Sequence, residues 1–121
     1  MGRWWFLQWI QQDWVQIAQP DMFACGGVTE WQRIADMASA HGVPVCTHAW
    51  HDFHAPLMAD APNAMMVEYF GDSRIVNLQE ILDRPQSIEG GYMILSDAPG
   101  FGFDFDEKAV ARTTRIAWKA G

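Results

Sequence analysis

The sequence has few cysteines, and this shortage excludes one class of protein. Its 121 residues include only Cys25 and Cys46, too few for the disulfide framework of a small secreted domain. Each lies in or beside an apolar segment, where a free thiol packs as a small hydrophobic side chain. We therefore expect a reducing, cytoplasmic setting.

Basic residues and long apolar runs are also scarce. Acidic residues outnumber basic ones by 15 to 8 and the formal net charge is −7, so most of the surface would repel nucleic acid. The opening MGRWWFLQWI is apolar, but Gln8 interrupts it and polar residues follow. We expect no nucleic-acid partner, no signal peptide and no membrane span.

Half of the residues are hydrophobic, which is enough for one core. Up to about residue 71, short β-prone runs alternate with helical patterns. The β-prone runs are residues 14–20, 43–48 and 63–70, and the helical patterns cover about residues 4–12, 25–42 and 51–61. This alternation predicts an α/β unit with a parallel sheet, in which the apolar third run is covered on both faces.

Side-chain spacing defines the predicted helices further. Thr29 and Gln32 have the spacing of a capping box at the start of the second helix. The residues expected to form apolar faces are Trp31, Ile34, Ala35 and Ala38 in that helix, and Phe53, Leu57 and Ala61 in the next.

The pattern changes after residue 71. Glycine and proline become frequent, and Phe101, Phe103 and Phe105 alternate with small or acidic residues, which favours extended ribbons and turns. Asp106 is placed to cap a last helix. We therefore predict two regions, residues 1–71 and an irregular tail of residues 72–121.

Each of the three β-prone runs ends near a polar residue: Asp21, His48 and Glu68. Because the carboxyl ends of parallel strands meet at one edge, we expect these side chains to lie close together. An aspartate beside a histidine can orient the ring, fix the nitrogen that carries the proton, and make a general base. Ordinary polar capping of strand ends is the alternative.

Histidines also recur at three-residue steps, as His48, His51 and His54. A zinc site is conceivable, but a strand end followed by a helix does not hold this spacing on one ligand sphere. We expect His51 and His54 to line the rim of a pocket or the outer helix surface, with His51 close enough to contact a substrate.

The order of these motifs resembles a known family. QPDMFACGGVTEWQRIADMASAHGVPVCTHAWH, then NAMMVEYF, then GGYMILSDAPGFGFDFDE, is similar to the C-terminal part of the enolase superfamily, in its mandelate racemase subgroup with many acid-sugar dehydratases. The resemblance implies that Asp21 and His48 form the catalytic dyad. It also implies that Glu68 contacts the substrate near its carboxylate.

The same resemblance shows what this chain does not contain. Members of the family have a capping domain and a (β/α)₇β barrel, with a lysine on an early strand and three acidic magnesium ligands on the middle strands. The resemblance therefore implies Mg²⁺ as cofactor, with no metal ligand in this chain. A closed barrel needs roughly 200 residues or more. We expect a partial (β/α) barrel, its last three parallel strands with helices, followed by a tail that would return to the capping domain.

These observations leave three hypotheses for function. The first is the C-terminal catalytic portion of an enzyme that removes the α-proton of a sugar acid, for dehydration or racemisation, and that is inactive without its N-terminal half. The second is a non-catalytic α/β module that associates with further copies of itself. The third is a small zinc protein that uses the histidines.

Overall fold

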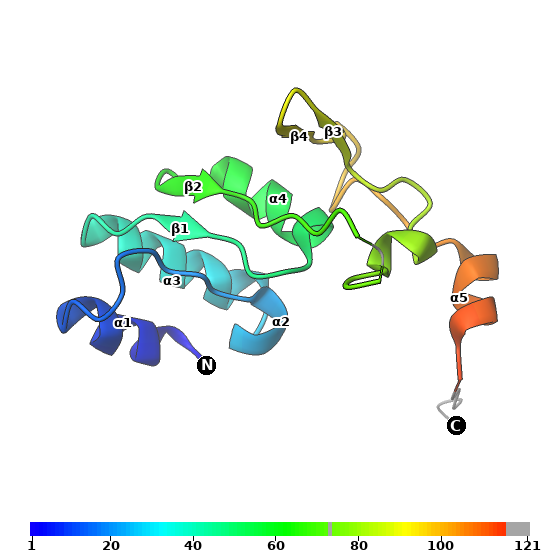
Figure 1. The fold of residues 1–121 in the computed structure, drawn as a ribbon. Coiled ribbons are helices and arrows are strands. Elements are labelled where there is room, and N and C mark those ends of the chain that lie inside the picture. Colours follow the sequence, from blue (N-terminus) through cyan, green and yellow to red (C-terminus); the bar gives the residue numbers. More distant parts are fainter. Residues whose placement is uncertain (73, 116–121) are drawn as a thin grey trace. The chain divides into compact units, whose positions relative to one another are not determined.

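The computed structural model describes residues 1–72 and 74–115. They fall into two compact units, Met1–Phe70 and Gly71–Gly121 (Figure 1). The assignment of residues 1–71 to a barrel and of residues 72–121 to a tail that meets a capping domain stays a prediction.

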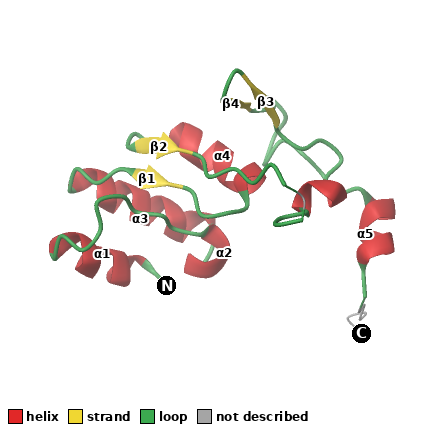
Figure 2. Cartoon of the chain, in the orientation of Figure 1, coloured by secondary structure: helices red, strands yellow, loops and turns green. Residues whose placement is uncertain are grey.

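Unit 1 alternates helices with short extended segments. Its elements are α1 (Arg3–Gln11), α2 (Met22–Cys25), α3 (Val28–Ala40), β1 (Val45–Cys46), α4 (His51–Asp60) and β2 (Ala64–Met66). β1 pairs in parallel with β2, and Ala18 forms one parallel bridge with Val45 on the other side of β1. Figure 2 shows how short the two strands are. The predicted α/β fold with three parallel segments is confirmed, although the first segment is reduced to a single bridge.

The α3 helix provides the core of unit 1. It contacts α1 and α2, and its predicted apolar face is confirmed, because Trp31, Ile34, Ala35 and Ala38 are all buried. The predicted capping box is wrong. The helix begins at Val28 after Gly27, which has a positive φ of 95°, so Thr29 already lies inside the first turn.

The α4 helix begins and ends as predicted, but its buried face differs from the predicted one. Leu57 is buried as expected, whereas Phe53 and Ala61 are only partly buried. The first turn instead buries the polar side chains of His51, Asp52 and His54. Apolar spacing missed this face because polar contacts within unit 1 hold those three side chains.

The covering of β2 also differs from the prediction. All three residues of β2 are exposed, and Met65 and Met66 keep 52% and 57% of their surface accessible. β2 has β1 as its only strand partner among the described residues, so its other edge is open within that part of the chain.

Unit 2 contains η1 (Leu78–Ile81), an antiparallel hairpin of β3 (Ser87–Glu89) and β4 (Tyr92–Ile94), and α5 (Glu107–Thr113). Gly90 and Gly91 join the two strands and both have positive φ, as a two-residue hairpin turn of type I′ requires. The predicted cap of α5 is confirmed, since Asp106 accepts hydrogen bonds from the first turn. Across residues 1–72 and 74–115, no helix has the length and apolar character to cross a membrane.

Candidate active site

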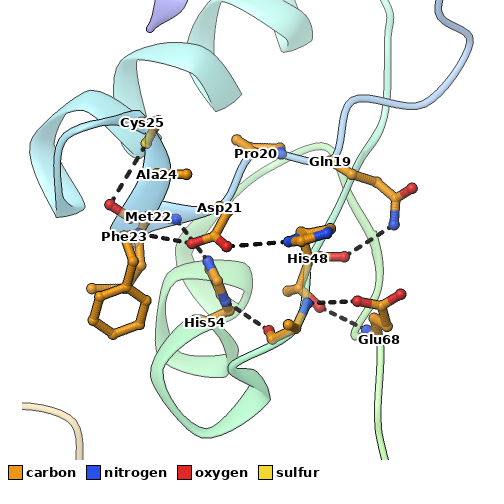
Figure 3. Close-up of polar contacts among 12 residues, drawn as sticks. Gln19, Pro20, Asp21, Met22, Phe23, Ala24, Cys25, His48, His54 and Glu68 are labelled. Carbon is orange, nitrogen blue, oxygen red and sulfur yellow. Dashed lines mark hydrogen bonds and ion pairs between the residues drawn. The ribbon is translucent and has the colours of Figure 1, made fainter. Parts of the chain in front are cut away.

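Asp21, His48 and Glu68 all follow the parallel segments of unit 1. Asp21 comes after the bridge at Ala18, His48 after β1, and Glu68 after β2. Because the segments are parallel, all three side chains lie at the same, carboxyl-terminal edge, as Figure 3 shows. The spatial expectation from the sequence is therefore met, while their catalytic roles stay proposals.

Asp21 and His48 form a hydrogen-bonded pair. His48 Nδ1 lies 3.1 Å from Asp21 Oδ2, and the other carboxylate oxygen, Oδ1, accepts from the Phe23 N–H at 2.8 Å. An ionised carboxylate only accepts hydrogen bonds, so Nδ1 carries the proton and Nε2 of a neutral ring keeps its lone pair. The His48 side chain is 60% exposed and that of Asp21 14%, so a substrate can reach the ring.

Thr47 ties the three segments together immediately before His48. It is completely buried; its carbonyl accepts from Gln19 Nε2 at 3.1 Å, and its Oγ1 accepts from the Glu68 N–H at 2.6 Å. Thr47 thus fixes the register of the edge that carries the dyad. Sequence reasoning missed this residue, although a threonine at a buried position of a strand signals a need for a polar partner.

Glu68 contacts the turn that follows His48. Its Oε2 accepts the Ala49 N–H, so the carboxylate lies against the backbone next to the dyad. Ala49 and Trp50 have positive φ values of 50° and 43°, which residues with a side chain seldom adopt. Such strain persists only where surrounding contacts impose it, and Glu68 provides one of them.

His51 does not lie on a rim or an outer surface, so its predicted position is wrong. The residue is 1% exposed, its Nε2 lies 3.2 Å from Asp52 Oδ2, and its ring packs edge-on against Tyr69 at 4.8 Å between centroids. Burial lowers the pKa of His51, and the charge of Asp52 acts in the opposite direction. The substrate contact predicted for His51 stays a prediction that this buried position does not favour.

His54 is also buried, contrary to the prediction for it. Its Nδ1 lies 3.0 Å from the Ala49 carbonyl oxygen, and its Nε2 accepts the Met22 N–H at 3.0 Å. Both ring nitrogens are thus engaged by backbone groups, so this ring has no lone pair left for zinc. The zinc hypothesis, which needed all three histidines, loses one ligand by geometry.

Comparison with known families gives the context of this site. The family model described as enolase C-terminal domain-like matches residues 1–109. The chain belongs to this family. Among curated proteins, this enolase C-terminal domain resembles a D-galactarolactone cycloisomerase of Agrobacterium fabrum, at 29% identity over 90% of this chain and 32% of that protein.

Solved structures show the same relationship. L-talarate/galactarate dehydratase from Salmonella typhimurium LT2 matches 96% of this enolase C-terminal domain with a TM-score of 0.85 and 27% identity. An enolase from alpha proteobacterium bal199 with bound magnesium matches 92% with a TM-score of 0.82 and 32% identity. The chain spans 28% and 29% of these two structures, and about a third of the curated relative.

Magnesium is bound in the alpha proteobacterium bal199 enolase and in a liganded structure of the Salmonella dehydratase. In residues 1–72 and 74–115, no group of three or more His, Cys, Asp or Glu side chains is placed to bind a metal ion. The two acidic residues of the site are already engaged, Asp21 by His48 and Glu68 by Ala49. The described donors therefore do not fit a magnesium site by themselves.

Proposed function

We propose that this chain supplies the general base of an enzyme that removes the α-proton of a sugar-acid carboxylate. The hydrogen bond between His48 Nδ1 and Asp21 Oδ2 carries this proposal, because it leaves Nε2 as the basic nitrogen on an exposed ring. The location supports it further, since ligands of parallel α/β folds bind at the carboxyl ends of the strands.

The residues of this chain have defined tasks in the proposed reaction. The substrate Cα–H bond breaks, the proton forms a bond with His48 Nε2, and the electron pair moves toward the substrate carboxylate. Asp21 holds the ring in the correct tautomer and stabilises the imidazolium that results. In a dehydration, the imidazolium gives its proton to the β-hydroxyl oxygen, the Cβ–O bond breaks as the electron pair from Cα forms the carbon–carbon double bond, and water leaves.

The relatives support a sugar acid as the substrate class. One solved relative is an L-talarate/galactarate dehydratase liganded with magnesium and L-lyxarohydroxamate, and another is an L-talarate dehydratase complexed with magnesium and L-glucarate. We propose that Glu68 helps to place such a substrate beside His48. Dehydration and racemisation both begin with the same proton transfer, and the products of the assay below distinguish them.

The test measures exchange of the substrate α-hydrogen with deuterated solvent by NMR, over a panel of sugar acids and 2-hydroxy acids. The chain is fused to, or co-produced with, the barrel part that precedes it in family members, because we expect the isolated chain to be inactive. His48→Asn should abolish exchange and Asp21→Asn should reduce it less. Loss of general base catalysis is worth about 10²–10⁴-fold in rate.

His41→Asn is the matched control, since His41 is exposed and its Nδ1 contacts only the Met37 carbonyl at 2.9 Å. This variant should exchange at the unaltered rate. Exchange that continues at that rate in His48→Asn would overturn the assignment of the base.

A second candidate function is a non-catalytic module that associates with further copies of itself. The exposed β2 strand, with Met65 and Met66 at its surface, is the observation that favours it. The two candidates predict different outcomes in the exchange assay, because only the first requires α-hydrogen exchange that depends on His48.

A further inference from the structure

One buried side chain bridges the two backbone segments that carry the dyad. His54, on the first turn of α4, is fully buried and bonds to Met22 and Ala49 through its two ring nitrogens. Met22 directly follows Asp21, and Ala49 directly follows His48. Figure 3 shows the His54 ring between these two segments.

The chemistry of the two bonds fixes the state of the ring. A carbonyl oxygen only accepts, so Nδ1 must donate its proton to Ala49, and the Met22 N–H donates, so Nε2 must offer a lone pair. Only the neutral ring with its proton on Nδ1 satisfies both. Burial is the largest cause that lowers the pKa of His54 and favours this neutral state, while the hydrogen bond to Ala49 and the charge of Asp21 act in the opposite direction.

A second buried ring holds the other side of Asp21. Trp31 Nε1 donates to the Pro20 carbonyl at 2.9 Å, and the Trp31 and His54 rings lie 6.3 Å apart between centroids. The backbone on both sides of Asp21 is therefore bonded to buried side chains. His54 is the one of the two that also reaches the turn after His48.

We propose that His54 is a positioning residue that keeps the Asp21 carboxylate and the His48 ring in hydrogen-bonding register. Its catalytic consequence rests on the function proposed above, whereas its geometric consequence does not. Without His54, the Met22 N–H and the Ala49 carbonyl lose their partners, and the two segments are no longer tied by one rigid ring. His48 then loses the contact that keeps its proton on Nδ1.

Three substitutions separate the two bonds. His54→Gln places a side-chain oxygen near the position of Nε2 and can keep the bond from Met22. His54→Asn places a donor near the position of Nδ1 and can keep the bond to Ala49. His54→Phe removes both bonds while it keeps a ring in the core. His41→Gln, at the exposed histidine, is the control.

The first readout is the tautomer of His48, measured by ¹⁵N NMR on the 121-residue chain, which has only four histidines to assign. We expect Nδ1–H in the unaltered chain and in His41→Gln. His54→Phe should show the tautomer mixture of an unpaired imidazole, and the Gln and Asn variants should lie between. This measurement needs no substrate, so it is independent of whether His48 is the base.

The second readout is the exchange assay on the complemented enzyme. His54→Phe should lower kcat about 10- to 100-fold with little change in KM, because misplacement of a catalytic group by about 1 Å has effects of this size. Partial rescue is expected in His54→Gln and His54→Asn. Should the Phe variant not fold, these two variants decide the question by the same readouts.

An unchanged His48 tautomer in folded His54 variants would overturn the proposal. The His54 variants could show a shifted His48 tautomer while His48→Asn still exchanges at the full rate. His54 would then remain a positioning residue, and only the assignment of His48 as the base would be overturned. A shifted tautomer with an unchanged kcat, in an enzyme that does need His48, would overturn the catalytic consequence of the proposal and leave the geometric one.

Discussion

His48 and His54 lie on the same short segment but in opposite environments. The His48 side chain is 60% exposed and pairs with a carboxylate, whereas His54 is fully buried and bonds only to backbone groups. An exposed ring can exchange protons with a substrate, and a buried ring with both nitrogens engaged cannot do so without losing a bond. These environments support the proposals that His48 transfers protons and that His54 positions it.

The two buried histidines should make the stability of the chain depend on pH. Burial lowers the pKa of His51 and of His54 in the folded state, so as pH falls the unfolded chain takes up these protons first. The contribution of the two histidines to the free energy of unfolding should therefore be fully present above about pH 6.5. It should decrease as pH falls below this value, by at most about 1.4 kcal/mol per pH unit for each histidine.

Urea unfolding followed by tryptophan fluorescence between pH 5.5 and 7.5 measures this dependence. His54→Gln should flatten the pH profile, and His41→Gln should leave it as it is. If the free energy of unfolding changed equally with pH in the unaltered chain and in both variants, the contribution of buried His54 to this pH dependence would be contradicted.

Glu68 should affect stability and substrate placement separately. In Glu68→Gln the side-chain oxygen can still accept the Ala49 N–H, so stability should change little and the effect should fall mainly on KM in the exchange assay. Glu68→Ala leaves that N–H without its acceptor and should lower the free energy of unfolding by about 1–3 kcal/mol. Equal stability of the Gln and Ala variants would show that the contact with Ala49 contributes nothing.

At the scale of the elements, helix starts differ in how well their sequences specify them. α5 is capped by Asp106, whose Oδ1 accepts hydrogen bonds from the Lys108 N–H at 2.9 Å and from the Ala109 N–H at 3.2 Å. α3 has no side-chain cap, and Gly27 directly precedes its first residue, Val28. α3 packs against α1 and α2, and the local pattern of Thr29 with Gln32 does not mark where it begins.

The cap of α5 gives a prediction for that helix. Asp106→Ala removes the acceptor for two N–H groups and should cost about 0.5–2 kcal/mol of helix stability. Faster hydrogen exchange at Lys108 and Ala109 would report this loss. Asp104→Ala is the matched control, because its exposed side chain takes no part in the cap, and it should leave exchange in α5 unaltered. Equal exchange in the two variants would contradict the capping role.

At the scale of the whole molecule, unit 1 exposes apolar side chains near its first and near its last residues. Trp4 and Trp5 of α1 are 70% and 56% exposed, and β2 carries exposed Met65 and Met66. An exposed, apolar edge strand is a template for pairing with another chain. The chain spans 29% of the magnesium-bound enolase it resembles.

We therefore predict that the isolated chain associates with itself in a concentration-dependent manner. Analytical ultracentrifugation should show this association for the unaltered chain and a decrease of it for Met65→Lys, because a charge on β2 blocks pairing at that edge. Ile75→Lys, which adds the same charge at a position 66% exposed outside β2, should associate like the unaltered chain. A monomer at every concentration would contradict the prediction and the second candidate function with it.

The sequence alone predicted the alternation of helices with parallel segments in unit 1 and the three polar residues that follow those segments, but not α2. Alternating β-prone and helical patterns predicted the α/β fold, and polar residues after successive strands identified Asp21, His48 and Glu68, since strand ends of parallel segments must meet at one edge. Local patterns carry this information because side-chain periodicity and strand direction follow from backbone geometry.

Only the tertiary structure decided which histidines are buried and what they bond. The sequence predicts His51 and His54 at the rim of a pocket or on the outer helix surface, yet both are buried, because the fold brings backbone groups and side chains to them as partners. Thr47 is similar: its two contacts come from neighbouring segments, Gln19 and Glu68. Burial of a polar side chain depends on such distant partners, and no periodicity within one segment encodes them.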